Sequence, residues 1–194
     1  MGRPKAFDEE QALDRAMELF WTKGYERTSI QELCEHSGLH RGSMYDTFGD
    51  KNELFLACLD RFRQTSKGTI FAVLDEAGEP KELLERFFEQ VIVRSLDDGK
   101  QRRGCFMANT AMELAQADAN VASRVEANML DTEQIFYRFL LRAQKNGNLK
   151  SKHSLRELAR FLVNTKQGLH VMAKTTTDAK VLQDVCKVAL SFLF

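Results

Sequence analysis

The residues that could do chemistry gather within the first third of the 194-residue chain. The guanidinium of Arg41 and the hydroxyls of Ser43, Tyr45 and Thr47 fall on the outward side of a short predicted helix. Arginine can bind a guanine edge with two hydrogen bonds, and hydroxyls suit phosphate oxygens. Gly42 removes a side chain where the backbone can come close to a ligand. We therefore expect these residues to contact DNA.

Two short helical patterns, separated by Ser37-Gly38-Leu39, would position these donors. The first begins at Thr28 or Ser29, since both fit a capping box, and the second covers about 40–48. Two helices joined by a tight glycine turn are typical of a helix-turn-helix, which places one helix in the DNA major groove. Thr28 and Lys51 lie at predicted helix starts, where phosphates bind. The same pattern alone also fits a three-helix bundle with a polar face.

The rest of the chain also carries helical periodicity. Asp8 is expected to cap the first helix, Glu79-Pro80 to begin another, and Asp118 to cap a long helix that ends at Gly147. Only two prolines occur and no hairpin signal stands out, so we predict an all-α fold. The polar stretch 65–68 suggests a boundary between an N-terminal domain (1–66, helix-turn-helix about 28–48) and a larger C-terminal helical domain (67–194).

Composition narrows the class of protein. Apolar residues make up 43% of the chain, which is enough for a core, and no apolar run reaches the length of a membrane span. Four scattered cysteines without an export signal favour a cytoplasmic protein with free thiols. Residues 1–66 hold nine Lys or Arg against twelve Asp or Glu, a net charge of −3, so DNA contacts must come from locally placed donors.

Other classes of function have weaker support. The chain has no HExxH sequence, no glycine-rich phosphate loop and no nucleophile elbow, which argues against an enzyme. Cys34, His36 and His40 surround the expected turn but lack a fourth ligand, so we predict no metal site and no cofactor. A helical interaction module that does not bind DNA remains an alternative.

Three segments of the chain resemble the N-terminal domain of the tetracycline-repressor (TetR) family. They read GYERTSI at 24–30, SGLHRGSMYDTF at 37–48 and DKNEL at 50–54. Departures from the family pattern occur at Leu39, His40, Asp46 and Thr47. The last two lie on the expected reading face, which implies a different operator. The similarity covers about the first third of the chain.

The resemblance implies a homodimeric transcription factor, usually a repressor, that binds a near-palindromic operator in double-stranded DNA. The C-terminal domain would bind a small-molecule effector and dimerise, and the last two helices, about 155–173 and 178–194, would pair into a four-helix interface. An effector among the middle helices would shift the fourth helix and release the protein from DNA. Transcriptional activators share this architecture, so activation stays an alternative. No membrane partner is implied.

The predicted DNA contacts combine the outward donors, the helix starts and an N-terminal arm that would enter the minor groove. They are Arg3, Lys5, Thr28, Arg41, Gly42, Ser43, Tyr45, Thr47 and Lys51. For the arm, the competing interpretation is a disordered terminus.

The predicted effector pocket consists of polar or polarizable residues on apolar helices. They are Cys105, Met107, Asn109, Met112, Glu113, Phe136, Thr165, Gln167 and His170. Fourteen phenylalanines suit an apolar or aromatic effector, although they equally suit a core. Cys105 lies beside Arg102 and Arg103 at a predicted helix start, where a thiol pKa falls, which would suit an oxidant or electrophile sensor. The alternative is a small buried hydrophobic residue.

Overall fold

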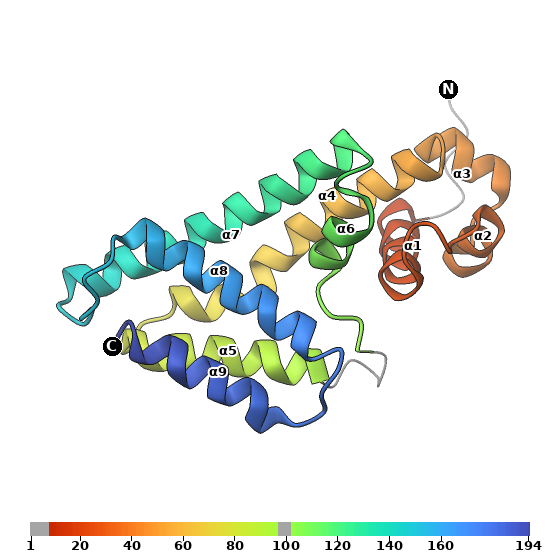
Figure 1. Ribbon diagram of the computed structural model, residues 1–194. Coiled ribbons are helices and arrows are strands. Elements are labelled where there is room, and N and C mark those ends of the chain that lie inside the picture. The colour runs from red at the N-terminus through yellow and green to blue at the C-terminus, as the bar shows by residue number, and fades with distance from the viewer. Residues whose placement is uncertain (1–7, 97–101) are drawn as a thin grey trace. The chain divides into compact units, whose positions relative to one another are not determined.

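The computed structural model describes residues 8–96 and 102–194, with the backbone alone at 67–68 (Figure 1). Over these ranges the chain forms nine α-helices and one 3-10 helix and has no strand, which confirms the all-α prediction. None of the described helices is long and apolar enough to cross a membrane. The elements are α1 (Glu9–Lys23), α2 (Ile30–Ser37), α3 (Arg41–Phe48), α4 (Lys51–Thr69), η1 (Ala72–Asp75), α5 (Pro80–Leu96), α6 (Phe106–Leu114), α7 (Ala119–Lys145), α8 (Leu155–Met172) and α9 (Ala179–Ser191).

The chain divides into two compact units. The first unit comprises residues 1–65 and 109–125, and the second comprises residues 66–108 and 126–194. The polar stretch 65–68 does not end a helix, because α4 continues through it to Thr69. Residues 109–125, at the end of α6 and the start of α7, therefore pack with the N-terminal helices although they lie far along the chain.

Short polar residues set the helix ends of the first unit. The carboxylate of Asp8 accepts a hydrogen bond from the Gln11 N–H, as predicted for the start of α1. Ser29 and Glu32 form a complete capping box, so Ser29 and not Thr28 begins α2. Glu32 also accepts a hydrogen bond from Lys23, and this contact, followed by those from Ser29, lowers the pKa of Glu32 to about 2.

Aromatic residues fill the centre of the first unit. The ring of Phe20 on α1 meets Phe55 on α4 edge to face, with centroids 4.9 Å apart, and Tyr25 packs on both rings. Cys58 is buried in the same core, and its pKa is raised by desolvation. This packing fixes α1 against α4. Helix α2 packs on α1, and α3 packs on α2.

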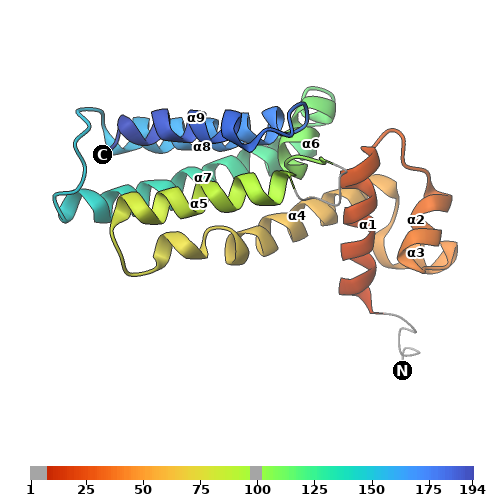
Figure 2. The ribbon, with the colours of Figure 1, turned by 90° about the horizontal axis from the view of Figure 1, so that it is seen from below.

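In the second unit, α5, α8 and α9 pack on one another and enclose much of the hydrophobic core. Each of these three helices contacts the other two, and α9 overlies α8 in the view of Figure 2. Phe71, next to η1, stacks on Phe87 of α5 with centroids 5.2 Å apart and meets Phe136 of α7 edge to face. The 3-10 helix η1 was not predicted; it brings Val73 and Leu74 into the same core.

Candidate nucleic-acid interface

Helices α2 and α3 form the predicted helix-turn-helix. Gly38 adopts φ +76°, a left-handed conformation that glycine tolerates best, and its N–H donates to the Cys34 carbonyl at 2.9 Å. Leu39 in the turn, Leu33 on α2 and Met44 on α3 are buried. Burial of this apolar seam fixes α3 against α2 and leaves the opposite side of α3 in solvent.

The solvent side of α3 carries the predicted reading residues. Arg41, Gly42 and Tyr45 are exposed, and Ser43 and Thr47 are half-buried beside them. The Arg41 guanidinium lies 5.8 Å from the centre of the Tyr45 ring. A Cβ placed on Gly42 would meet no atom within 4 Å, so the backbone there is open. The surface thus presents a cation, a flat ring, hydroxyls and bare backbone, which are groups that bind DNA.

Lys51 begins α4 and is held in place by an aromatic ring. Its Nζ atom lies 4.2 Å from the centre of the Tyr25 ring, close enough for a cation–π contact. Desolvation raises the pKa of Tyr25, so the ring side chain stays uncharged. A lysine fixed at a helix N-terminus, where free N–H groups add partial positive charge, suits a phosphate.

Three of the predicted DNA contacts differ from the rest, Thr28 by its burial and Arg3 and Lys5 by their place in the chain. Thr28 is only 1% exposed, and its hydroxyl donates to the Gly24 carbonyl at 2.6 Å. This hydroxyl therefore closes the turn that precedes α2, and its contact with a phosphate stays a prediction. Arg3 and Lys5 of the expected arm lie outside the described residues.

A carboxylate from α6 holds the turn between α1 and α2. The two oxygens of Glu113 accept hydrogen bonds from the backbone N–H groups of Tyr25 at 3.2 Å and Glu26 at 3.0 Å. Gly24 has φ +83°, and a Cβ there would lie 3.0 Å from the same oxygens. We call this arrangement the Glu113 clamp. It was not predicted, because Glu113 was expected to line an effector pocket.

Two further contacts join residues 109–125 to α4 within the first unit. The side-chain amide of Asn52 donates to the Asp118 carboxylate at 2.9 Å, and this bond is the main reason that the pKa of Asp118 is lowered. Arg124 pairs with Asp60 at 3.0 Å. Asp118 also caps α7 as predicted, accepting from the N–H of Asn120. Helix α4, whose first residue is Lys51, is therefore tied to this segment at Asn52 and at Asp60.

The nine residues of the predicted effector pocket fall in both compact units. Cys105, Met107, Phe136, Thr165, Gln167 and His170 belong to the second unit, and Asn109, Met112 and Glu113 to the first. Met112 is exposed, whereas Met107 and Phe136 are fully buried. The Nδ1 atom of His170 and the hydroxyl of Ser95 share a hydrogen bond of 3.0 Å. The sequence did not predict this partner.

Cys105 is buried and directly precedes α6. Its neighbour Gly104 has φ +69° and packs on the end of α8, where a Cβ would lie 3.2 Å from the His170 carbonyl oxygen. Arg102 also has a positive φ, of 46°. The loop before α6 is therefore held in an unusual conformation next to His170.

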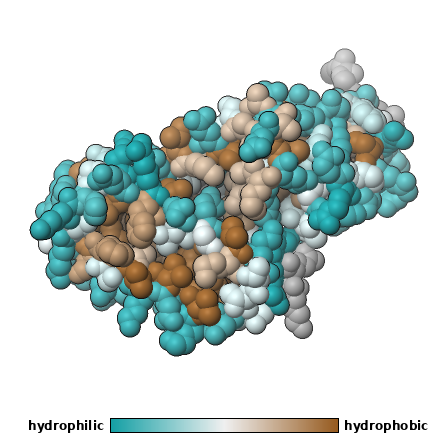
Figure 3. Space-filling view, viewed as in Figure 1, coloured by the Kyte–Doolittle hydropathy of each residue, from teal (hydrophilic) through white to brown (hydrophobic). Residues whose placement is uncertain are grey.

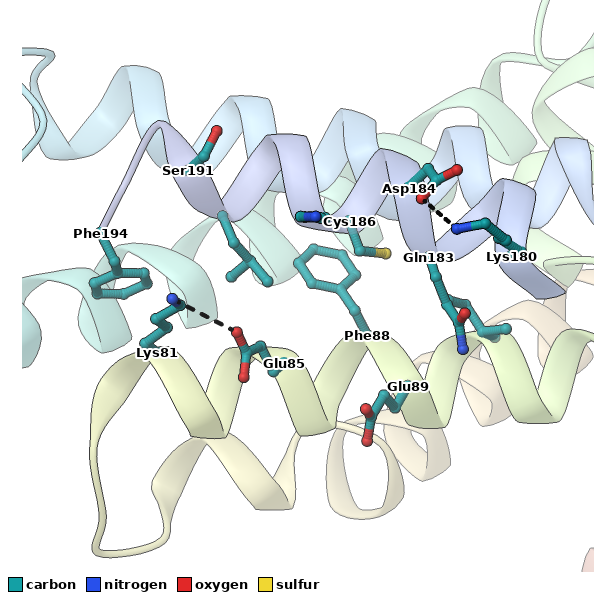
Figure 4. Close-up of a pocket in the computed structure, with 13 residues that line it drawn as sticks. Lys81, Glu85, Phe88, Glu89, Lys180, Gln183, Asp184, Cys186, Ser191 and Phe194 are labelled. Carbon is teal, nitrogen blue, oxygen red and sulfur yellow. Dashed lines mark hydrogen bonds and ion pairs between the residues drawn. The ribbon is translucent and has the colours of Figure 1, made fainter.

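A solvent-open groove of about 590 Å³ lies between α5 and α9 (Figure 4). Phe88 points from α5 toward Cys186, whose pKa desolvation raises to about 11. Two ion pairs, Lys81 with Glu85 and Lys180 with Asp184, line the rims. None of the predicted pocket residues lines this groove.

An apolar patch covers the outer side of α8 and α9 (Figure 3). We name it the α8–α9 patch, and its members are the exposed residues Phe161, Val171, Val181, Val185, Val188 and Phe192. Phe161 and Phe192 touch edge to face, with centroids 6.2 Å apart. An exposed patch of this kind marks an interaction surface.

The fold and the exposed face of α3 define a helix-turn-helix DNA-binding protein. Residues 12–58 match the family model described as bacterial regulatory proteins of the tetR family, and residues 80–189 match the model of the tetracyclin repressor-like C-terminal domain. The chain belongs to the TetR family of transcriptional regulators. It is a DNA-binding regulator and not an enzyme.

Three comparisons place the chain among its relatives. It is 36% identical to the regulator YezE of Bacillus subtilis (strain 168), with both chains fully covered. It is 30% identical to the repressor ComR of Escherichia coli (strain K12), over 97% of this chain and 90% of ComR. A structure of a cysteine-substituted TetR-family regulator, CifR, in complex with 26 bp operator DNA is 29% identical and has a TM-score of 0.85 with both chains fully covered.

Proposed function

We propose that the chain is a homodimeric repressor, acting in the cytoplasm, that binds a near-palindromic operator through α3 and leaves it when a small molecule binds. The exposed face of α3 carries this proposal, because Arg41 and Tyr45 lie in solvent there and Ser43 and Thr47 are half-buried beside them. In the proposal Arg41 and Tyr45 contact bases or phosphates, Ser43 and Thr47 contact phosphates, and Lys51 anchors the backbone. The operator complex of CifR supports this assignment.

The α8–α9 patch is the proposed dimer surface. Its valines and phenylalanines would lose contact with water if a second copy covered them, and such burial drives association. A dimer also presents two copies of α3, as recognition of a palindrome requires.

The proposed DNA contacts can be tested by fluorescence anisotropy with genomic fragments, followed by titration of the fragment that binds. We expect salt-sensitive binding by the wild type. Tyr45→Ala and Lys51→Ala should each weaken it by about 1–3 kcal/mol, the scale of a lost DNA contact, and leave helix content and dimerisation unchanged. Asp75→Ala, at an exposed site in the second unit, is the control. Unchanged affinity in both variants would refute the placement of α3 on DNA.

Release from DNA has two proposed triggers, an apolar or aromatic effector and oxidation or alkylation of Cys105. Substituted cysteines in the CifR operator complex draw attention to this residue type. We expect diamide or peroxide to release wild-type protein from its operator and to leave Cys105→Ser bound, while Cys186→Ser responds as the wild type does. If Cys105→Ser is still released, or if the wild type never is, then Cys105 has only a packing role.

A further inference from the structure

Lys166 is a buried charge in the middle of the apolar side of α8. It lies in line with Leu158, Leu162 and Leu169, which are buried in the core of the second unit. Only 7% of Lys166 is exposed. A lysine is almost never buried to this degree unless a negative partner compensates its charge, so the position needs an explanation.

The described residues supply no such partner. No carboxylate among them lies within ion-pair distance of the Lys166 ammonium, and its Nζ atom donates no hydrogen bond to any of them. The Nζ atom lies over the face of the Phe71 ring, 5.9 Å from the ring centre. A cation–π contact at this distance replaces only part of the hydration that burial removes.

The neighbouring polar groups do not compensate the charge either. His170 lies one helical turn further along α8, and desolvation, aided by the charge of Lys166, lowers its pKa to about 3. The imidazole is therefore neutral at physiological pH and shares a hydrogen bond with Ser95. The side-chain oxygen of Gln167 is buried without a hydrogen-bond partner. One stretch of α8 thus holds a charge and an amide oxygen that nothing in the described chain satisfies.

We propose that the effector of this regulator carries an anionic group, such as a carboxylate, on an apolar body, and that Lys166 forms the ion pair with that group. This inference rests on the proposed function, in which a small molecule controls DNA binding. Phe71, whose ring centre lies 5.9 Å from the ammonium, belongs to a group of packed rings with Phe87 and Phe136. An apolar body bound beside the cation would therefore meet aromatic surface. The pairing would be strong, because charged hydrogen bonds gain strength away from water.

The test compares matched acids and amides on the full-length protein. Thermal unfolding of the wild type is followed with benzoate, benzamide, octanoate, octanamide and phenyl phosphate. We expect at least one carboxylate to raise Tm and to bind at least about tenfold more tightly than its amide, because the neutral amide cannot pair with the ammonium. Phenyl phosphate distinguishes a site for carboxylates from one that also accepts phosphates.

Variants identify the residue responsible. Lys166→Met keeps the length of the side chain and removes the charge, so we expect a higher Tm without any added compound and no preference for acid over amide. Lys145→Met, at an exposed lysine on α7, should behave as the wild type does.

Three results would overturn the proposal: equal binding of acid and amide to the wild type, no rise in Tm with any of the acids, or an intact preference in Lys166→Met. Operator binding is measured separately on the same proteins. If the wild type binds no operator, the proposed function is refuted. A preference for acids that depends on Lys166 would still establish the anion site in that case.

Discussion

The imidazole of His170 illustrates how burial at one residue sets a dependence on pH. Its ordinary pKa of 6.5 falls to about 3 in the folded chain, mainly through desolvation and secondly through the nearby charge of Lys166. Between these two values an unfolded chain binds a proton that the folded chain rejects. Acid therefore favours unfolding in this window, and the stability present above pH 6.5 is lost as the pH falls toward 3.

We predict that His170→Gln reduces this loss. Lowering the pH from 7.5 to 5.0 should cost the wild type up to about 2 kcal/mol more unfolding free energy than the variant, and the partial exposure of the residue makes this figure an upper bound. Urea unfolding at the two pH values measures the difference. His153→Gln, at an exposed histidine, is the control, and the same pH slope in wild type and His170→Gln would contradict the assignment.

Spacing in the sequence identified the exposed residues of α3, because the buried residue Met44 defines which side of a short helix faces out. It did not predict the backbone partners of Thr28 and Glu113, which are the Gly24 carbonyl four residues away and the N–H groups of the distant Tyr25 and Glu26. Lys166 was missed, although an ionisable residue in line with Leu162 and Leu169 is a readable signal. Partners remote in the chain cannot be found from local spacing.

At the scale of elements, the helices were predictable because their ends are chemically marked. Asp8, Ser29 and Asp118 accept hydrogen bonds from the first N–H groups of their helices, and Pro80 begins α5. The 3-10 helix η1 has no cap of this kind and forms through the burial of Val73 and Leu74. This element depends on tertiary packing, which local helix propensity cannot predict.

The Glu113 clamp gives an element-scale prediction. Removal of its carboxylate leaves the N–H groups of Tyr25 and Glu26 without their acceptor and loosens the turn that leads into α2. We expect Glu113→Ala to lower the unfolding free energy by about 1 kcal/mol and to weaken operator binding a few-fold, with helix content unchanged by circular dichroism. Glu126→Ala, at an exposed glutamate on α7, should change neither quantity. A clamp variant with wild-type stability and affinity would show that the turn needs no support from α6.

At the scale of the whole molecule, assembly is the property to test. Val188 lies in the α8–α9 patch and is 56% exposed in the single chain. In a two-fold dimer Val188→Asp would place two carboxylates in an apolar interface, where their desolvation is costly. We expect a monomer by analytical ultracentrifugation and at least about a tenfold loss of operator affinity, since one reading helix cannot span two half-sites.

Val93 on α5 provides the matched control. It is 61% exposed and lies outside the α8–α9 patch, so Val93→Asp should leave both assembly and operator affinity as in the wild type. A Val188→Asp protein that still sediments as a dimer would assign the dimer contact to another surface.

The membership of residues 109–125 in the first unit has a consequence for biosynthesis and for engineering. A nascent chain that has emerged only as far as position 66 lacks Glu113, Asp118 and Arg124. Its first 65 residues therefore form these contacts only after about sixty further residues have been synthesised. Chimeras that join this DNA-binding unit to another effector domain should carry both residues 1–65 and residues 109–125. A graft of the first segment alone would leave Asn52 and Asp60 without the partners that they have here.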